Sequence, residues 1–234
     1  MTTPQAQRQI GTLRVTADSY LVTKKRSSID AKTLTELVQS SCLAITSSSS
    51  PKLDQFVHLC RRALHYEVNQ PGTPPSFAEV EAILMELFPL IDELFFFRIL
   101  TRRVYVDAKQ KKTRQLVDLK LLRERRNRAQ GVYQHHPKVR IKIWLIKAYG
   151  DSVPLSRLLL ALLHEACHAF FAILADDKHP GHRKWVKAHR AHGEMFVVLN
   201  TFVMQCVTDL VPSEVLRNLR IEELRFFRTR GWSQ

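Results

Sequence analysis

This chain of 234 residues has few cysteines, no long apolar run and fewer acidic than basic residues. Each of these shortages argues against a class of protein or of site. The four cysteines contain no C-x-x-C pair, so we expect no disulfide framework and no thiolate zinc finger, and we expect a reducing, intracellular compartment. No run of 18 apolar residues and no apolar leader occurs, so neither a membrane span nor secretion is expected. With 45% hydrophobic residues, the chain can still bury one ordinary core.

Acidic residues are outnumbered by basic ones, 22 to 36, and the excess is concentrated in one region. Residues 98–147 contain 16 Lys or Arg and three Asp or Glu, a net charge of +13, which leaves +1 for the rest. A polyanionic partner explains this concentration, because neutralised phosphates release counterions. We therefore expect DNA as a partner; the alternatives are a solvated face, an acidic protein or lipid headgroups. The candidate nucleic-acid contacts are Arg123, Arg125, Arg126, Arg128, Arg140 and Lys142.

Residues 164–168 read His-Glu-Ala-Cys-His, an H-E-x-x-H motif, inside an apolar stretch that is expected to form a buried helix. Because a helix repeats every 3.6 residues, His164 and His168 lie one turn apart on one face, where both imidazoles can bind one Zn²⁺. This composition would produce such a match by accident only about 0.02 times, which disfavours two core histidines around a surface glutamate. Glu165 is the candidate base that takes a proton from water activated by the metal. The motif therefore predicts a zinc-dependent hydrolase.

A catalytic zinc site needs a third protein ligand, and the residues after the motif leave several candidates. A metzincin would have Gly at position 171 and His at position 174, where this chain has Phe171 and Leu174, so that class is excluded. The segment 176–196 is rich in histidine instead, and either Asp176 or Asp177 could hold a ligand imidazole through a hydrogen bond. The competing third ligands are His179, His182, His189, His192 and Glu194.

Two short motifs together resemble a known family. The sequence His-Glu-Ala-Cys-His-Ala at 164–169, followed by His-Gly-Glu-Met-Phe at 192–196, is similar to the SprT-like metalloproteases, whose pattern is H-E-x-x-H-A and later H-G-x-x-F. The resemblance implies that Gly193 allows close helix packing at the site and that Phe196 lies in the core. It implies these roles: zinc ligands His164, His168 and His192, and catalytic base Glu165.

The same resemblance carries expectations about biology. The family includes the animal protease of DNA–protein crosslinks, so the resemblance implies cleavage of DNA-associated proteins, a part in DNA repair and, in a eukaryote, a nuclear location. Cys167 lies inside the motif and invites a reading as a cysteine nucleophile, but its place beside a metal-binding imidazole favours packing. We expect a protein substrate, and a monomer is favoured.

The composition along the chain predicts an N-terminal tail followed by one domain. Residues 1–50 are polar, and apart from a short helix at Ala31–Cys42 we expect a flexible N-terminal tail. Residues 51–234 are expected to form a single SprT-like zincin domain. Its parts are helices over 51–100, a basic β region over 104–146, zinc-binding helices over 154–207 and a C-terminal helix over 213–230. The second of the zinc-binding helices is expected to start near Gly181 or Lys187.

The basic region predicts strands, and the order of strands before helices predicts an α+β fold. The four expected strands are Val104–Ala108, Leu116–Leu122, Gly131–His135 and Val139–Ile146, separated by charged turns at Lys109–Arg114 and Arg123–Arg128. We expect a zincin-like lobe in which a small antiparallel sheet lies over the motif helix, with additional helices around it, and in which the edge strand can receive an extended substrate.

Three functions fit these patterns. The first is a zinc endopeptidase of SprT-like type that acts on DNA-associated proteins. The second is a zinc peptidase without a nucleic-acid role, in which the basic residues serve acidic substrates. The third is a basic nucleic-acid-binding protein in which the metal only joins two helices and no hydrolysis takes place.

Overall fold

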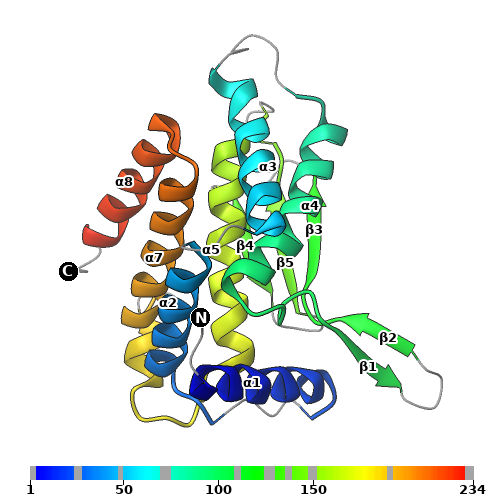
Figure 1. The fold of residues 1–234 in the computed structure, drawn as a ribbon, viewed down its shortest axis with the longest axis vertical. Helices are drawn as coiled ribbons and strands as arrows, with labels where there is room; N and C mark the ends of the chain where they lie inside the picture. The colour runs from blue at the N-terminus through cyan, green and yellow to red at the C-terminus, as the bar shows by residue number, and fades with distance from the viewer. Residues whose placement is uncertain are drawn as a thin grey trace.

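The computed structural model describes residues 4–23, 28–46, 50–68, 75–107, 112–123, 130–134, 139–146, 152–188 and 192–229. Over these residues the fold is α+β, as expected, and mostly helical (Figure 1). The elements in chain order are α1 (Pro4–Thr23), α2 (Ala31–Thr46), α3 (Pro51–Val68), α4 (Phe77–Phe95), β1 (Arg103–Asp107), β2 (Lys112–Gln115), β3 (Asp118–Leu122), β4 (Gly131–Gln134), β5 (Arg140–Trp144), α5 (Leu155–Leu174), the π-helical turn η1 (Arg183–Lys187), α7 (Glu194–Leu210) and α8 (Glu214–Arg228).

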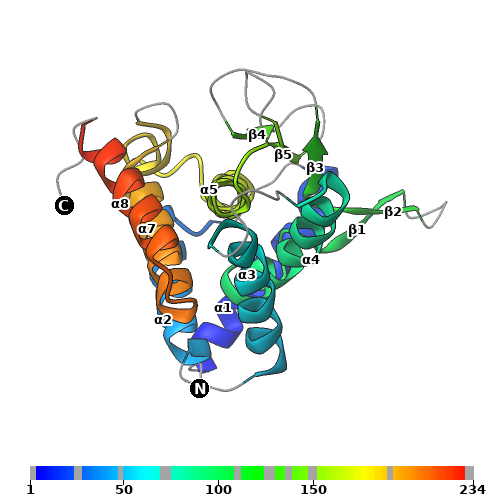
Figure 2. The ribbon, with the colours of Figure 1, turned by 90° about the horizontal axis from the view of Figure 1, so that it is seen from above.

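Helix α5 is the centre of the structure, because its sequence is apolar on nearly every side and such a helix must be surrounded. Fifteen of its 20 residues are buried. Figure 2 shows it end-on, with β3, β4 and β5 on one side, α7 and α8 on another, and α3 and α4 on a third. By length and composition α5 could also cross a membrane, but 72% of its apolar window is buried by the rest of the chain, as in the core helix of a folded domain.

The β region forms a hairpin and a separate mixed sheet, which corrects the expected single antiparallel sheet. Strands β1 and β2 pair with each other, so part of the expected turn 109–114 is in fact a strand. In the second sheet the order is β3-β5-β4, with β4 antiparallel and β3 parallel to β5. Alternating apolar residues indicate which face of a strand is buried, but they do not determine the direction of its neighbour.

The N-terminal region is not the flexible tail that its polar composition suggested, because α1 and α2 both bury side chains. Leu13 and Ala17 of α1 are fully buried, as are Leu34 and Val38 of α2. Helix α2 packs along α7, and α1 lies across one end of α5 next to β1 (Figure 1). A few apolar residues at helical spacing are enough here, because the surface that they cover is supplied by distant parts of the chain.

The two helices before the strands agree with the sequence prediction. The Ser50 hydroxyl accepts a hydrogen bond from the Leu53 N–H at 3.2 Å, at the start of α3. Ser76 and Glu79 form a capping box at the start of α4. Such caps depend on residues a few positions apart, so their pattern is local in the sequence.

Candidate metal centre

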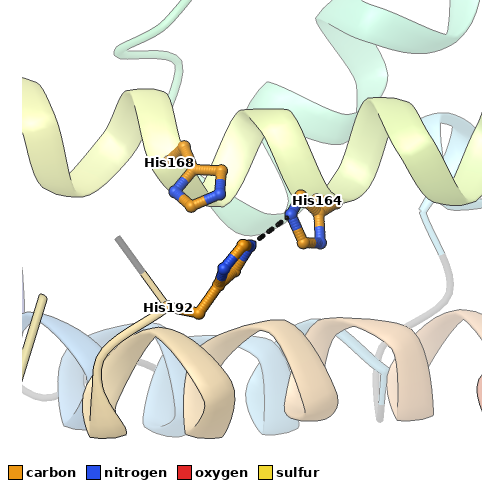
Figure 3. Close-up of side chains that lie close together, drawn as sticks. All are labelled: His164, His168 and His192. Atoms are coloured by element: carbon orange, nitrogen blue, oxygen red, sulfur yellow. Dashed lines mark hydrogen bonds between the residues drawn. The ribbon is translucent and has the colours of Figure 1, made fainter. Parts of the chain in front are cut away.

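Three histidines from two separate segments converge beside α5. His164 and His168 project from one face of α5, and His192 reaches them from the residue pair that precedes α7 (Figure 3). One ring nitrogen of each lies within 4.8 Å of the others, and all three side chains are partly buried. The Nε2 atoms of His164 and His192 are 3.0 Å apart. The structure thus brings the three predicted ligands close enough to bind one metal ion.

The spacing and the chemistry of this set fit such an ion. Nitrogens bound at about 2.0–2.1 Å around a tetrahedral ion lie roughly 3.3 Å from one another, near the 3.0 Å separation of the two Nε2 atoms. Burial lowers the pKa of His168, and the charges of His164 and His192 lower it further. A low pKa favours the neutral imidazole, which is the form that binds a metal.

Close backbone packing positions His192. Gly193 is the N-cap of α7, and its N–H donates a hydrogen bond to the Val186 carbonyl at 3.2 Å. A Cβ on Gly193 would lie 2.3 Å from the carbonyl carbon of Trp185, so only glycine allows the backbone of η1 to lie this close to the start of α7. The expectation that Gly193 permits close packing is therefore confirmed. The helix itself begins only at Glu194, later than expected, so His192 precedes the helix and does not lie on it.

Phe196 forms an apolar wall behind the three imidazoles. It is fully buried, as expected, and its ring stacks on His168 with centroids 4.0 Å apart and an angle of 18° between the planes. It meets His164 and His192 edge-on, at 5.0 and 4.9 Å. Phe196 lies in the first turn of α7, and His192 lies two residues before that helix begins. The wall restricts the rings and leaves their nitrogens pointing at one another.

Glu165 lies on a different side of α5, against strand β4. Its side chain is buried and accepts a hydrogen bond from the Tyr133 backbone N–H. Burial raises the pKa of Glu165, and this effect is opposed by the charge of His164 and by the Tyr133 hydrogen bond. A Cβ on Gly131 would lie 2.8 Å from Glu165 Cγ, so glycine is needed for β4 to approach this closely. The predicted base is therefore enclosed, in surroundings that raise its pKa.

Glu223 of α8 is part of the site, although the sequence analysis did not identify it. Its Oε1 is 3.0 Å from His164 Nδ1, so the Nδ1–H can donate to the carboxylate while Nε2 faces His192. Carboxylates often orient metal-binding imidazoles in this way. The expectation for Asp176 differs from what is found, since its carboxylate accepts a hydrogen bond from the Lys178 N–H in its own turn. No local pattern links Glu223 to the motif, because the two are 59 residues apart.

The competing third ligands have other roles where the structure describes them. The His179 ring stacks on Trp185, with centroids 4.8 Å apart. His182 is buried outside the cluster, and Glu194 forms an ion pair with Lys184 at 3.1 Å. The remaining competitor, His189, lies outside the described residues.

Cys167 is inaccessible to solvent. It is fully buried on the side of α5 away from solvent, and burial raises the pKa of its thiol. A reactive cysteine needs a thiolate and an exposed sulfur. The structure therefore agrees with a packing role for this residue.

A cleft of about 750 Å³ opens onto the site. His164, His192 and Glu165 line it, together with Gly131 of β4 and four residues of α8. Its remaining lining residues are Gln130, Arg157, Leu160, Ala161, Met204, Leu219, Glu222, Glu223 and Phe226. The metal-binding group is thus accessible to a ligand large enough to fill the cleft.

The predicted nucleic-acid contacts are only partly described. The Arg123 guanidinium pairs with Glu81 at 2.8 Å and lies over the Phe77 ring. Arg140 pairs with Asp118 at 3.2 Å, which joins β5 to β3. Lys142 is a partly buried residue of β5, whereas Arg125, Arg126 and Arg128 lie outside the described residues. A role of these residues in binding DNA stays a prediction.

Comparisons of the chain with protein-family models, with curated proteins and with solved structures found no match. Function is therefore inferred from the geometry of the site.

Proposed function

We propose that this chain is a zinc-dependent endopeptidase of SprT-like type that cleaves proteins associated with DNA. The observation that carries the proposal is the convergence of His164, His168 and His192 beside an open cleft that His164, His192 and the buried Glu165 line together. A purely structural metal would not need an accessible cleft or a buried carboxyl group next to the ligands. Three imidazoles without a thiolate are a donor set typical of catalytic zinc, since they leave a position open.

Each residue has a separate task in peptide hydrolysis. A bound zinc ion would supply a Lewis acid that polarises the scissile carbonyl and makes water more acidic. Glu165 takes the proton from the attacking water and then returns it to the leaving amine nitrogen. Burial helps the second half of this task, because it raises the pKa of Glu165 and lets the carboxyl group hold the proton. Glu223 keeps the His164 ring oriented throughout.

Strand β4 provides a surface for an extended peptide. It is an edge strand of the sheet formed by the described strands, and its first residue, Gly131, lines the cleft together with Gln130. A peptide that adds to such an edge is held by main-chain hydrogen bonds, which suits a protease with varied protein substrates.

The alternative without a nucleic-acid role is favoured by one observation. Two of the predicted DNA contacts, Arg123 and Arg140, are already paired with carboxylates within the chain. Paired arginines attract a polyanion less strongly than free ones, so the basic region alone does not decide between a DNA-associated and a general peptidase.

The substitution Glu165→Gln tests the enzymatic assignment. We expect the purified variant to hold as much zinc as the wild type, measured by elemental analysis, while cleavage of a labelled protein falls by about 10²–10⁴-fold. Glu86→Gln changes an exposed carboxyl group on α4 that does not line the cleft; this variant is the matched control and should cleave normally. Undiminished cleavage by Glu165→Gln, or cleavage by wild type after the metal is removed with a chelator, would rule out the mechanism.

Adding DNA to the same assay tests the substrate class. Cleavage of a DNA-binding protein should increase when single-stranded or duplex DNA is present. Cleavage that is indifferent to DNA would favour the general peptidase, and zinc binding without any cleavage would favour the non-catalytic alternative.

A further inference from the structure

A second cavity, away from the metal centre, is lined by three arginines. It has a volume of about 290 Å³ and is formed by Arg14, Arg98, Thr101 and Arg102. Arg14 comes from α1, and the other three come from the turn between α4 and β1. Figure 1 shows α1 beside the base of the β1–β2 hairpin, which projects from the body of the molecule. We call these four residues the arginine pocket.

The turn that contributes three of these residues is stabilised by hydrogen bonds to a buried carboxylate. Asp92 accepts hydrogen bonds from the Leu100 N–H at 2.9 Å and from the Thr101 N–H and hydroxyl at 2.7 and 2.6 Å. Phe97 and Arg98 both adopt left-handed backbone with φ of 60°, which is uncommon for residues other than glycine. The side chains of the pocket are therefore presented by a backbone whose conformation is set by buried interactions.

Helix α1 completes the pocket. The Arg14 Nε–H donates to the Phe97 carbonyl at 3.2 Å, and Arg102 forms a two-pronged ion pair with Asp18 of α1. These contacts join residues that are 83 and 84 positions apart, and the guanidinium groups of Arg14 and Arg102 line the same pocket. The pocket exists only because α1 docks on the body, which explains why the polar composition of the N-terminal region did not indicate it.

The pocket has more positive charge than its carboxylate neighbours neutralise. Asp18 pairs with Arg102, and Arg98 is two-thirds exposed, with Glu93 at 4.0 Å as its ion-pair partner among the described residues. Among the described residues, no carboxylate lies within ion-pair distance of Arg14. This differs from Arg123 and Arg140, whose guanidinium groups are each held by a carboxylate at 3.2 Å or less.

We infer that the arginine pocket binds a backbone phosphate of a nucleic acid. Planar guanidinium groups with several free N–H donors match the oxygens of a phosphate, and clusters of them are typical phosphate sites. The strand β1 starts directly after the pocket, at exposed Arg103, and its partner strand carries Arg114. A single anion could contact the pocket alone, whereas a chain of phosphates could also contact Arg103 and Arg114 of the hairpin, and this favours a polyanion. The inference rests on the proposed association with DNA and needs no proteolysis.

Binding of the full chain to labelled single-stranded and duplex DNA, measured by fluorescence anisotropy at several salt concentrations, tests this inference. The double variant Arg14→Ala/Arg98→Ala should weaken binding by about tenfold or more and reduce the slope of log K against log salt by about 0.7–0.9 for each phosphate lost. The matched control is Arg61→Ala/Arg62→Ala, which removes two exposed arginines from α3 and should change affinity by less than about twofold. Arg98→Ala alone should weaken binding in the same direction without disturbing the Arg14 hydrogen bond, and thermal unfolding followed by circular dichroism verifies folding.

Several outcomes would overturn the inference. Equal losses for the two double variants would mean that only net charge matters, and no loss for either would mean that the pocket makes no contact. Inorganic phosphate binding that depends on Arg14, without an effect on DNA, would indicate a small-anion site. Pocket-dependent binding to vesicles with anionic lipid, but not to DNA, would indicate a membrane surface. Because no hydrolysis is measured, a failed protease assignment leaves these results unchanged.

Discussion

The metal centre and the basic region show two ways in which one chain positions charged groups. At the metal centre, each donor is fixed by buried neighbours: Gly193 sets the backbone before α7, Phe196 packs behind the rings, and Glu223 orients His164. In the basic region, the side chains of Arg123 and Arg140 are 54% and 20% exposed, and each pairs with a partly exposed carboxylate. Preorganised buried groups are strongly coupled to one another, whereas exposed charges are screened by water and salt. Substitutions at the centre should therefore have large, specific effects, and single substitutions in the basic region should have small, salt-dependent ones.

The largest effect is expected from Gly193→Ala. The new methyl group would overlap backbone atoms of Trp185 and Val186, which cannot move aside as a side chain could. We expect the free energy of unfolding to fall by more than about 3 kcal/mol, together with weaker metal binding, because His192 must shift. Urea denaturation and a zinc titration measure the two effects.

Gly11→Ala is the control for that substitution, because a Cβ there would meet nothing within 4 Å. In the middle of α1, alanine should stabilise the protein by about 0.5–1 kcal/mol relative to glycine. A Gly193→Ala protein that binds zinc like the wild type would show that close packing is not what positions His192.

An intermediate effect is expected from Glu223→Gln. Loss of a carboxylate that orients a ligand imidazole typically weakens metal affinity by about 10–100-fold, and this variant keeps the size of the side chain. The neighbouring Glu222→Gln removes the same charge from a carboxylate that pairs with Arg157 instead of a histidine. Competition with a chromophoric chelator measures both affinities. Equal changes in the two variants would mean that Glu223 acts only through net charge, and the distinction between the two regions would weaken.

The smallest effect is expected for the pair formed by Arg140 and Asp118. The two side chains are 20% and 41% exposed and lie 3.2 Å apart. A double-mutant cycle with alanine should give a coupling energy of about 0.2–1 kcal/mol that decreases as salt is added. A much larger coupling energy that does not depend on salt would mean that this pair is preorganised like the groups of the metal centre.

Local patterns were sufficient for much of the site. The i, i+4 spacing of His164 and His168 and the capping box of α4 depend on residues close together in the chain. The choice of His192 follows from the resemblance to the SprT-like pattern H-G-x-x-F, and the structure brings the three imidazoles together. Long-range partners were not accessible in this way. Glu223 and the approach of Gly131 to Glu165 join elements whose contact has no periodic signal in the sequence.

Composition and periodicity alone therefore settle that this chain has a buried helix bearing an H-E-x-x-H motif, an α+β character and a concentrated positive charge. Three features emerge only when the elements pack: the mixed direction of the second sheet, the docking of α1 and α2, and the arginine pocket between α1 and the turn after α4. The physical reason is that helix and strand periodicity arise from neighbouring residues, whereas strand direction and docking depend on which distant surfaces are available to bury.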